Sequence, residues 1–185
     1  TPTGAVHALR SPNLSARYRA WTALVGMQSH ARAELESMAA DPNPRFRARA
    51  LWVLAAIGDG AARAIKMALR DEAEDVRLLA LRIARRHRLP VEPVVRRLVR
   101  DDSALVRREC AVSLHQLDSP QSVQLWVKLA LQHDGKDRWY LEALGIGEVG
   151  KEAACLDAWL APNILAPKLW TATSCIRSTS SGHAT

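Results

Sequence analysis

The stretch that decides the fold is Val76-Arg77-Leu78-Leu79-Ala80-Leu81, because variants of it recur along the chain at a fixed interval. At steps of thirty residues the sequence repeats an apolar residue, then an arginine, then a small residue three positions later. The copies are Ala16-Arg17-Tyr18-Arg19-Ala20-Trp21, Phe46-Arg47-Ala48-Arg49-Ala50-Leu51, Val76-Arg77-Leu78-Leu79-Ala80-Leu81 and Val106-Arg107-Arg108-Glu109-Cys110-Ala111. A fixed internal period of this length indicates a repeat architecture.

Each repeat carries two apolar stripes whose members are three or four residues apart. This spacing places them on one face of a helix, so each repeat is predicted to be a pair of helices. Turn-forming residues separate the two helices of a pair, and Ser, Asp or Asn precedes the first helix, where such residues cap N-termini. The predicted breaks within pairs are Gly58-Asp59-Gly60, Leu89-Pro90, Ser119-Pro120 and the segment 145–150.

A helical hairpin of thirty residues cannot bury its apolar face alone, so neighbouring hairpins must stack into one continuous core. We therefore predict an all-α protein, an α-solenoid of about five stacked hairpins, and no sheet. An N-terminal extension would span 1–10, and an irregular or disordered Ser/Thr-rich tail would span 161–185, where Pro162 and Pro167 are expected to break any helix. The array itself would span 11–160, in units of about 11–40, 41–70, 71–100, 101–131 and 132–160.

The composition is that of a folded protein with a basic surface. Apolar residues make up 48% and charged residues 24% of the chain, and 26 Lys and Arg against 19 Asp and Glu give a net charge of +7. An anionic partner therefore has to be considered. The three cysteines lie far apart and the six histidines form no helix-spaced pair, so we predict no metal, cofactor or catalytic residue. No apolar run is long enough for membrane insertion.

The pattern Asp-x5-Arg at the start of each first helix, followed by Ala three residues later, resembles short HEAT-like repeats of the PBS-lyase-like kind. The resemblance covers about 11–160 and implies a ladder of hydrogen bonds that joins successive repeats, which is a structural role. Ser11 replaces the acid in the first unit. The ladder residues would be Arg17, Asp41, Arg47, Asp71, Arg77, Asp101 and Arg107.

Two stretches, 11–21 and 139–147 with 155–160, resemble more narrowly the HEAT segment of large bacterial proteins often labelled membrane-bound dehydrogenases. Those proteins join a β-propeller to HEAT-like repeats and a c-type haem domain. The resemblance implies an exported, periplasmic scaffold between redox modules, whereas a cytoplasmic location is expected without it. Since this sequence contains neither a propeller nor a Cys-x-x-Cys-His site, dehydrogenase or haem chemistry would belong to other parts of a longer chain.

The segment Gly145-Ile146-Gly147-Glu148-Val149-Gly150 has the G-x-G-x-x-G spacing of a dinucleotide-binding loop. Such a loop follows a strand and opens a helix, whereas a helical pattern precedes this one. We therefore predict an inter-helix turn, equivalent to Gly58-Asp59-Gly60, and no nucleotide site.

Large and reactive side chains are expected in the core. Cys110 occupies the small-residue position where other repeats have alanine, which predicts an inert buried thiol. Aromatic residues at helical spacing usually fill cores, so core packing is favoured over ligand stacking for the tryptophans. These are Trp21, Trp52, Trp126, Trp139 and Trp159.

Cations on the polar side of successive second helices are the candidate partner-binding residues. The period aligns Lys66 with Arg96 and Arg70 with Arg100, which would make a basic stripe across repeats. In HEAT-like repeats the second helices line the concave face. The candidate residues are Arg63, Lys66, Arg70, Arg96, Arg97 and Arg100.

The predicted function is a non-catalytic scaffold that binds another protein or a neighbouring domain of its own chain. The alternative is sequence-independent nucleic-acid binding through the basic stripe, because a positive face attracts phosphates without reading bases. No convergent set of catalytic groups is visible, so no enzyme activity is expected.

Overall fold

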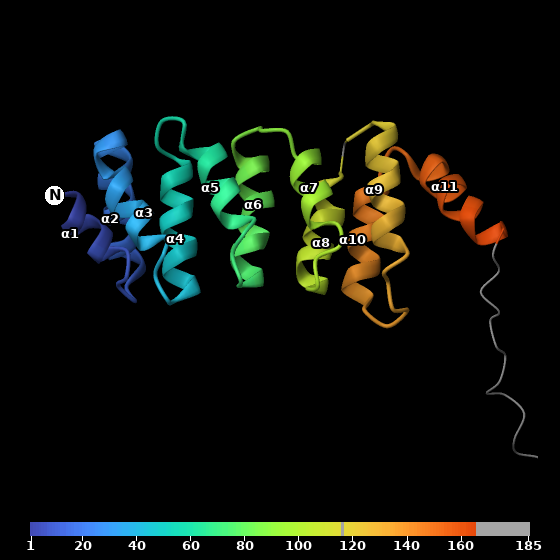
Figure 1. The fold of residues 1–185 in the computed structure, drawn as a ribbon, viewed down its shortest axis with the longest axis horizontal. Coiled ribbons are helices and arrows are strands. Elements are labelled where there is room, and N and C mark those ends of the chain that lie inside the picture. The colour runs from blue at the N-terminus through green and yellow to red at the C-terminus, as the bar shows by residue number, and fades with distance from the viewer. Residues whose placement is uncertain (116, 166–185) are drawn as a thin grey trace, which may run out of the picture.

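The computed structural model describes residues 1–115 and 117–165, and every regular element in that part of the chain is a helix (Figure 1). The helices are α1 (Pro2–Ala8), α2 (Leu14–Met27), the 3-10 helix η1 (Gln28–Ala31), α3 (Arg32–Met38), α4 (Pro44–Ala55), α5 (Gly60–Ala68), α6 (Glu74–Arg86), α7 (Glu92–Leu98), α8 (Ala104–Ser113), α9 (Pro120–Ala130), α10 (Arg138–Glu148) and α11 (Glu152–Leu165).

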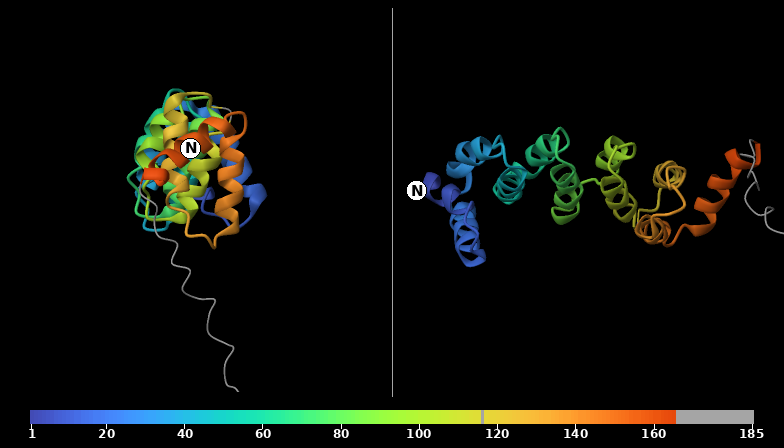
Figure 2. Two further views of the ribbon diagram at one scale, coloured as in Figure 1. Left: turned by 90° about the vertical axis from the view of Figure 1, so that its right-hand side faces the viewer. Right: turned by 90° about the horizontal axis from the view of Figure 1, so that it is seen from below.

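Successive helix pairs stack side by side into an elongated array of two layers (Figure 2). The first-helix layer contains α2, α4, α6, α8 and α10, and the second-helix layer contains α3, α5, α7 and α9. Neighbouring first helices from α4 to α10 contact one another directly, whereas α3, α5 and α7 mainly contact first helices. The predicted α-solenoid is confirmed.

The sequence starts the first helices where the repeat predicts. Asn13 Oδ1 accepts a hydrogen bond from the Ala16 N–H at 3.1 Å and caps α2, and Asn43 and Ser103 cap α4 and α8. A side-chain oxygen at this position satisfies an N–H that has no partner inside the helix. A polar residue thereby fixes where α2, α4 and α8 begin, whereas Ala73 precedes α6 and offers no side-chain cap.

The core follows the thirty-residue period. Ala50, Ala80 and Cys110 are fully buried at equivalent positions, as are Leu24 and Leu54. Burial raises the pKa of the Cys110 thiol, because the charged thiolate is disfavoured away from water. Each hairpin thus contributes the same small and large side chains to one continuous core.

The N-terminal segment 1–10 forms a helix that belongs to the stack. Helix α1 packs on α2 and α3, and it buries Val6 and Leu9. Leu9 lies thirty residues before Ala39, which is the C-cap residue of α3. Helix α1 therefore takes the position of a second helix. At the other end, α11 packs on α9.

The interpretation of Gly145-Ile146-Gly147 as part of a turn was wrong. Helix α10 continues to Glu148, and the turn lies at Gly150, whose φ is +84°. A Cβ on Gly147 would lie 2.4 Å from the Ala111 carbonyl oxygen, closer than any real contact. Gly147 therefore allows the backbone of α10 to lie directly against α8.

The expectation that the tryptophans fill the core was wrong for three of them. Trp126 is buried and donates from Nε1 to the Leu144 carbonyl at 2.8 Å, and Trp21 is half-buried, but Trp52, Trp139 and Trp159 are exposed. Trp52 follows the buried Leu51, and one residue turns a helix by about 100°, which takes its ring out of the core.

The expected helix break at Pro162 was also wrong, because α11 runs on to Leu165. The fixed φ of proline suits a helical backbone, at the loss of one hydrogen bond. The predicted Ser/Thr-rich tail beyond it, with Pro167 and Cys175, lies outside the described residues. Among the helices described, none combines the length and hydrophobicity needed to span a membrane.

Replacement of Gly147 by alanine should lower the free energy of unfolding by about 1–3 kcal/mol, because the added methyl group meets the backbone of α8. Gly145→Ala is the matched control in the same helix, since its Cβ would have no other atom within 4 Å. That control should raise stability by about 0.5–1 kcal/mol through helix propensity. Chemical denaturation followed by circular dichroism measures both, and equal effects would contradict the close approach.

Candidate functional site

Successive repeats are joined by a paired hydrogen bond between an arginine and an aspartate. Arg47 donates from Nε to Asp71 Oδ2 at 2.8 Å and from Nη2 to Asp71 Oδ1 at 2.7 Å. Its Nη1 donates to the carbonyls of Asp41 and Pro42, both at 3.0 Å. One guanidinium therefore holds the loop before its own helix and the loop of the next repeat.

Arg77 makes the same set of contacts one repeat later. Its Nε and Nη2 donate to the two carboxylate oxygens of Asp101 at 2.7 and 2.8 Å, and Nη1 donates to the carbonyls of Asp71 and Glu72. The planar fork of arginine matches the two oxygens of a carboxylate. Each such Arg–Asp pair, called a rung below, fixes the distance and the relative orientation of two neighbouring repeats. Two consecutive rungs set α4, α6 and α8 in register.

The rungs also shift the pKa values of their members. The hydrogen bond to Asp71 raises the pKa of Arg47, and the hydrogen bond to Asp101 raises that of Arg77. Burial opposes ionisation of Asp101, but the hydrogen bonds from Arg77 and from the Ser103 N–H hold its pKa below the ordinary value. Arg77 and Asp101 are therefore both charged at neutral pH, and their hydrogen bonds are charge-assisted.

The ladder changes at both ends. Arg107 donates from Nη1 to the carbonyls of Asp101 and Asp102, but Leu131 stands where the next acid would be. The Arg107 guanidinium instead lies 5.7 Å from the centre of the Tyr140 ring. This cation–π contact takes the place of the carboxylate.

At the first repeat, Arg17 donates from Nη1 to the carbonyls of Ser11 and Pro12 at 2.9 and 2.7 Å, as the other ladder arginines do. Asp41, however, pairs with Arg10, whose Nη1 lies 2.5 Å from its carboxylate. The expected rung between Arg17 and Asp41 is therefore replaced by one that starts in the α1–α2 loop. The repeat pattern contained no sign of this exchange.

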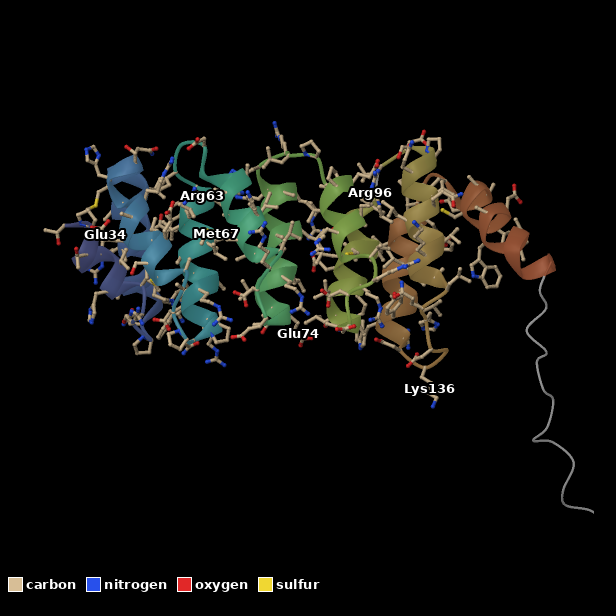
Figure 3. The ribbon with its side chains drawn as sticks, viewed as in Figure 1. Glu34, Arg63, Met67, Glu74, Arg96 and Lys136 are labelled. Carbon is tan, nitrogen blue, oxygen red and sulfur yellow. The ribbon has the colours of Figure 1, made fainter. Side chains whose placement is uncertain are left out.

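All six candidate partner-binding cations are exposed: Arg63 and Lys66 lie on α5, Arg96 and Arg97 lie on α7, and Arg70 and Arg100 lie in the turns that follow these helices. Figure 3 shows Arg63 on α5 and Arg96 on α7. Arg63 pairs with Glu36 of α3 at 2.6 Å, and Arg96 pairs with Glu92 of its own helix at 2.8 Å. In the described part of the chain, the other four have no ion-pair partner: Lys66, Arg70, Arg97 and Arg100.

The structure adds Lys128 of α9 to this group. A groove between α7 and α9 is lined by Arg96, Gln124 and Lys128, among others. Lys128 is exposed and makes no ion pair with any described residue. Sequence reasoning missed it because Lys128 lies two residues away from the positions equivalent to Arg96 and Arg100.

The first-helix layer has a different charge arrangement near its middle. Arg82 and Arg85 of α6 both pair with Glu109 of α8, the first at 3.3 Å. Arg108 of α8 lies 3.8 Å from Asp137 before α10. Arg82, Arg85 and Arg108 are thus neutralised by carboxylates of neighbouring repeats, whereas Lys66, Arg97 and Lys128 on α5, α7 and α9 have no carboxylate partner among residues 1–115 and 117–165.

Groups that could carry chemistry are sparse. Within residues 1–115 and 117–165, no cluster of three or more His, Cys, Asp or Glu could hold a metal ion. Cys110 and Cys155 are free thiols buried in the core, and burial raises the pKa of Cys155 as well. Inert thiols of this kind are structural.

Comparison with known proteins agrees with this geometry. Residues 62–145, from the second repeat into the fifth, match the family model of HEAT repeats. The match supports a HEAT-like repeat family for this chain, and the fold is that of a helical repeat protein. No curated protein and no solved structure matches. The narrower resemblance to bacterial dehydrogenase proteins is not confirmed by these comparisons.

Because Arg10 takes the place of Arg17 in the pair with Asp41, we expect Arg17 and Arg47 to contribute unequally to stability. Arg47→Gln should lower the free energy of unfolding by about 3 kcal/mol, because it leaves the buried Asp71 carboxylate unpaired. Arg17→Gln should cost only about 1 kcal/mol, since it removes hydrogen bonds to carbonyls and no ion pair. Urea denaturation of the two variants measures the difference, and equal losses would contradict a ladder that changes at its first repeat.

Proposed function

We propose that this chain is a non-catalytic repeat scaffold that binds an acidic surface of another protein, or of a neighbouring domain, through its second-helix layer. HEAT repeats generally mediate protein interaction as scaffolds, and stacked repeats offer long surfaces. The single observation that carries the proposal is a row of exposed cations that have no ion-pair partner among the described residues. They are Lys66, Arg70, Arg97, Arg100 and Lys128.

The Arg–Asp rungs give this row a fixed geometry. Because the rungs of Arg47 and Arg77 set the second, third and fourth repeats in register, the helices that carry these cations have fixed positions relative to one another. The backbone that carries these charges needs no ordering when a partner docks, so less entropy is lost on binding than with a flexible segment. Complementary charge also speeds encounter and selects the partner.

Arg63 and Arg96 contribute less positive charge to the surface than the unpaired cations do. Each has a carboxylate within hydrogen-bond distance, so each is partly neutralised and contributes less to the field. We therefore expect the positive charge of the row to come mainly from the cations without ion-pair partners in the described chain, Lys66, Arg70, Arg97, Arg100 and Lys128. This is where an acidic partner surface would dock.

The double variant Arg97→Glu/Arg100→Glu should abolish retention of protein partners, because it reverses the charge of the row without touching the core. Affinity capture from an extract, with nuclease treatment, would compare wild type with this variant. Lys136→Glu/Arg138→Glu is the control, since it makes the same change in net charge at the start of α10, where Lys136 lies in the preceding loop (Figure 3) and Arg138 is the first helical residue. The proposal fails if every protein retained by the wild type is retained equally by the double variant.

Sequence-independent nucleic-acid binding through the same row is the second candidate function. The same five cations favour it, because phosphate backbones are bound by cations without base-reading groups. Fluorescence polarisation with a labelled single strand and a labelled duplex tests it. Affinity that falls steeply with salt and is lost in Arg97→Glu/Arg100→Glu would support it, whereas salt-insensitive or undetectable binding would remove it.

We further propose that the array is a segment of a larger exported protein, where it lies between redox modules. The support is the resemblance of 11–21, 139–147 and 155–160 to the HEAT segment of bacterial membrane-bound dehydrogenases. The genomic reading frame on both sides tests this proposal. An adjoining β-propeller or Cys-x-x-Cys-His motif would support it, and unrelated neighbouring sequence would reject it.

A further inference from the structure

A groove opens in the first-helix layer near the N-terminal end of the array, between α2 and α4. Its apolar lining includes Leu14, Tyr18 and Trp21 of α2 and Trp52 of α4. The polar groups in it belong to Arg17, Arg49 and the Tyr18 ring, and no Asp or Glu of the described chain lines it. It lies on the opposite layer from the basic row, so a ligand bound in this groove would be independent of the proposed function.

The groove exists because α2 stands apart from the next first helix. Helix α2 contacts α4 far less than α4 contacts α6 or α8 contacts α10. The same repeat junction lacks the Arg17–Asp41 rung, because Arg10 pairs with Asp41. At this junction a gap lined with side chains remains between the two first helices.

The apolar stripe on α2 is largely uncovered by the described part of the chain at Leu14 and Tyr18, whereas Trp21 is half-buried. Leu14, Tyr18 and Trp21 recur at spacings of four and three residues, so they share one face of the helix. Leu14 is 72% exposed and Tyr18 is 67% exposed. The Tyr18 and Trp21 rings are stacked, with centres 6.3 Å apart, and form a broad aromatic surface.

Arg17 offers the edge of its guanidinium that its equivalents use for a carboxylate. In Arg47 and Arg77, Nε and Nη2 both donate to the aspartate of the next repeat. In Arg17 only Nη1 donates, to the carbonyls of Ser11 and Pro12, and Nε and Nη2 have no partner among the described residues. Arg17 therefore has an unfilled place for one carboxylate.

Arg49 adds to the positive charge of the groove. Its Nη1 donates to the Leu9 carbonyl at 2.7 Å, which fixes its side chain without neutralising it. Burial, together with the charges of Arg17 and Arg45, lowers the pKa of Arg49. A carboxylate in this groove would thus meet an arginine fork within a field of several uncompensated cations.

We propose that the groove between α2 and α4 binds a short acidic segment of a partner protein. One large apolar side chain of that segment packs against Tyr18 and Trp52. A neighbouring carboxylate accepts hydrogen bonds from Nε and Nη2 of Arg17, as Asp71 does from Arg47. Aromatic and aliphatic side chains with an arginine beside them are the composition of interaction hot spots. A peptide fits this lining because it is mostly apolar and because the free edge of the Arg17 guanidinium matches a single carboxylate.

The test is selection of peptides from a display library of random 12-residue segments on the purified wild-type protein. Enriched sequences should combine Asp or Glu with Trp, Phe or Leu. The best peptide, labelled with fluorescein, should bind Arg17→Gln and Trp52→Ser at least about tenfold more weakly than wild type, as expected for a lost charged hydrogen bond or anchor contact. Trp52 is exposed, so its replacement should leave the circular dichroism spectrum unchanged.

Two controls separate this site from the basic row. Trp139→Ser removes an exposed tryptophan of the same layer at its other end, and Arg97→Glu/Arg100→Glu alters the second-helix layer. Both should bind the peptide as wild type does. The inference is overturned if no peptide is enriched, if the enriched peptides lack acidic residues, or if Arg17→Gln binds with unchanged affinity. Self-association that buries the groove, or binding of phosphate-containing oligonucleotides there instead, would also overturn it.

Discussion

The array depends on one interaction, the two parallel hydrogen bonds from an arginine of one repeat to the aspartate that opens the next. Apolar burial supplies the free energy that drives the hairpins together, but it is not directional and leaves their relative rotation loosely defined. The paired bonds of Arg47 with Asp71 and of Arg77 with Asp101 define it, because a fork meeting a carboxylate has one good geometry. The carbonyl contacts of the same guanidinium then fix the loops in which the first helices begin.

With the middle repeats held in this way, the two layers have different chemistry. The second-helix layer carries cations that lack carboxylate partners in the described chain, and the first-helix layer pairs its cations across α6 and α8 but exposes aromatic rings at its ends. A surface of charges suits partners that arrive by long-range attraction, whereas an apolar groove suits a segment that has to be held once it has arrived. A single short solenoid can therefore offer two kinds of contact.

Much of this was predictable because the repeat constrains every unit equally. The arginines at 17, 47, 77 and 107, the buried alanines and the helix caps come from the thirty-residue period, and the exposure of the second-helix cations comes from helical spacing. The features that could not be predicted depend on pairs that lie far apart in sequence. Gly147 lies inside a helix whose backbone packs closely against the carbonyl of Ala111. Trp52 is exposed because no described helix covers it, and Asp41 binds Arg10 because α1 joins the stack.

The exchanged rung at Asp41 makes the junction between the first two repeats different from the later junctions. In a linear array, stability is close to a sum over repeats and over the interfaces between neighbours, so separation costs least where an interface is smallest. The helix α2 is thus the place where local opening should begin, ahead of the register-locked middle. A molecule that binds in the groove between α2 and α4 stabilises the state in which α2 is packed, by mass action. Binding at this end of the array and the order of the first repeat are therefore thermodynamically linked.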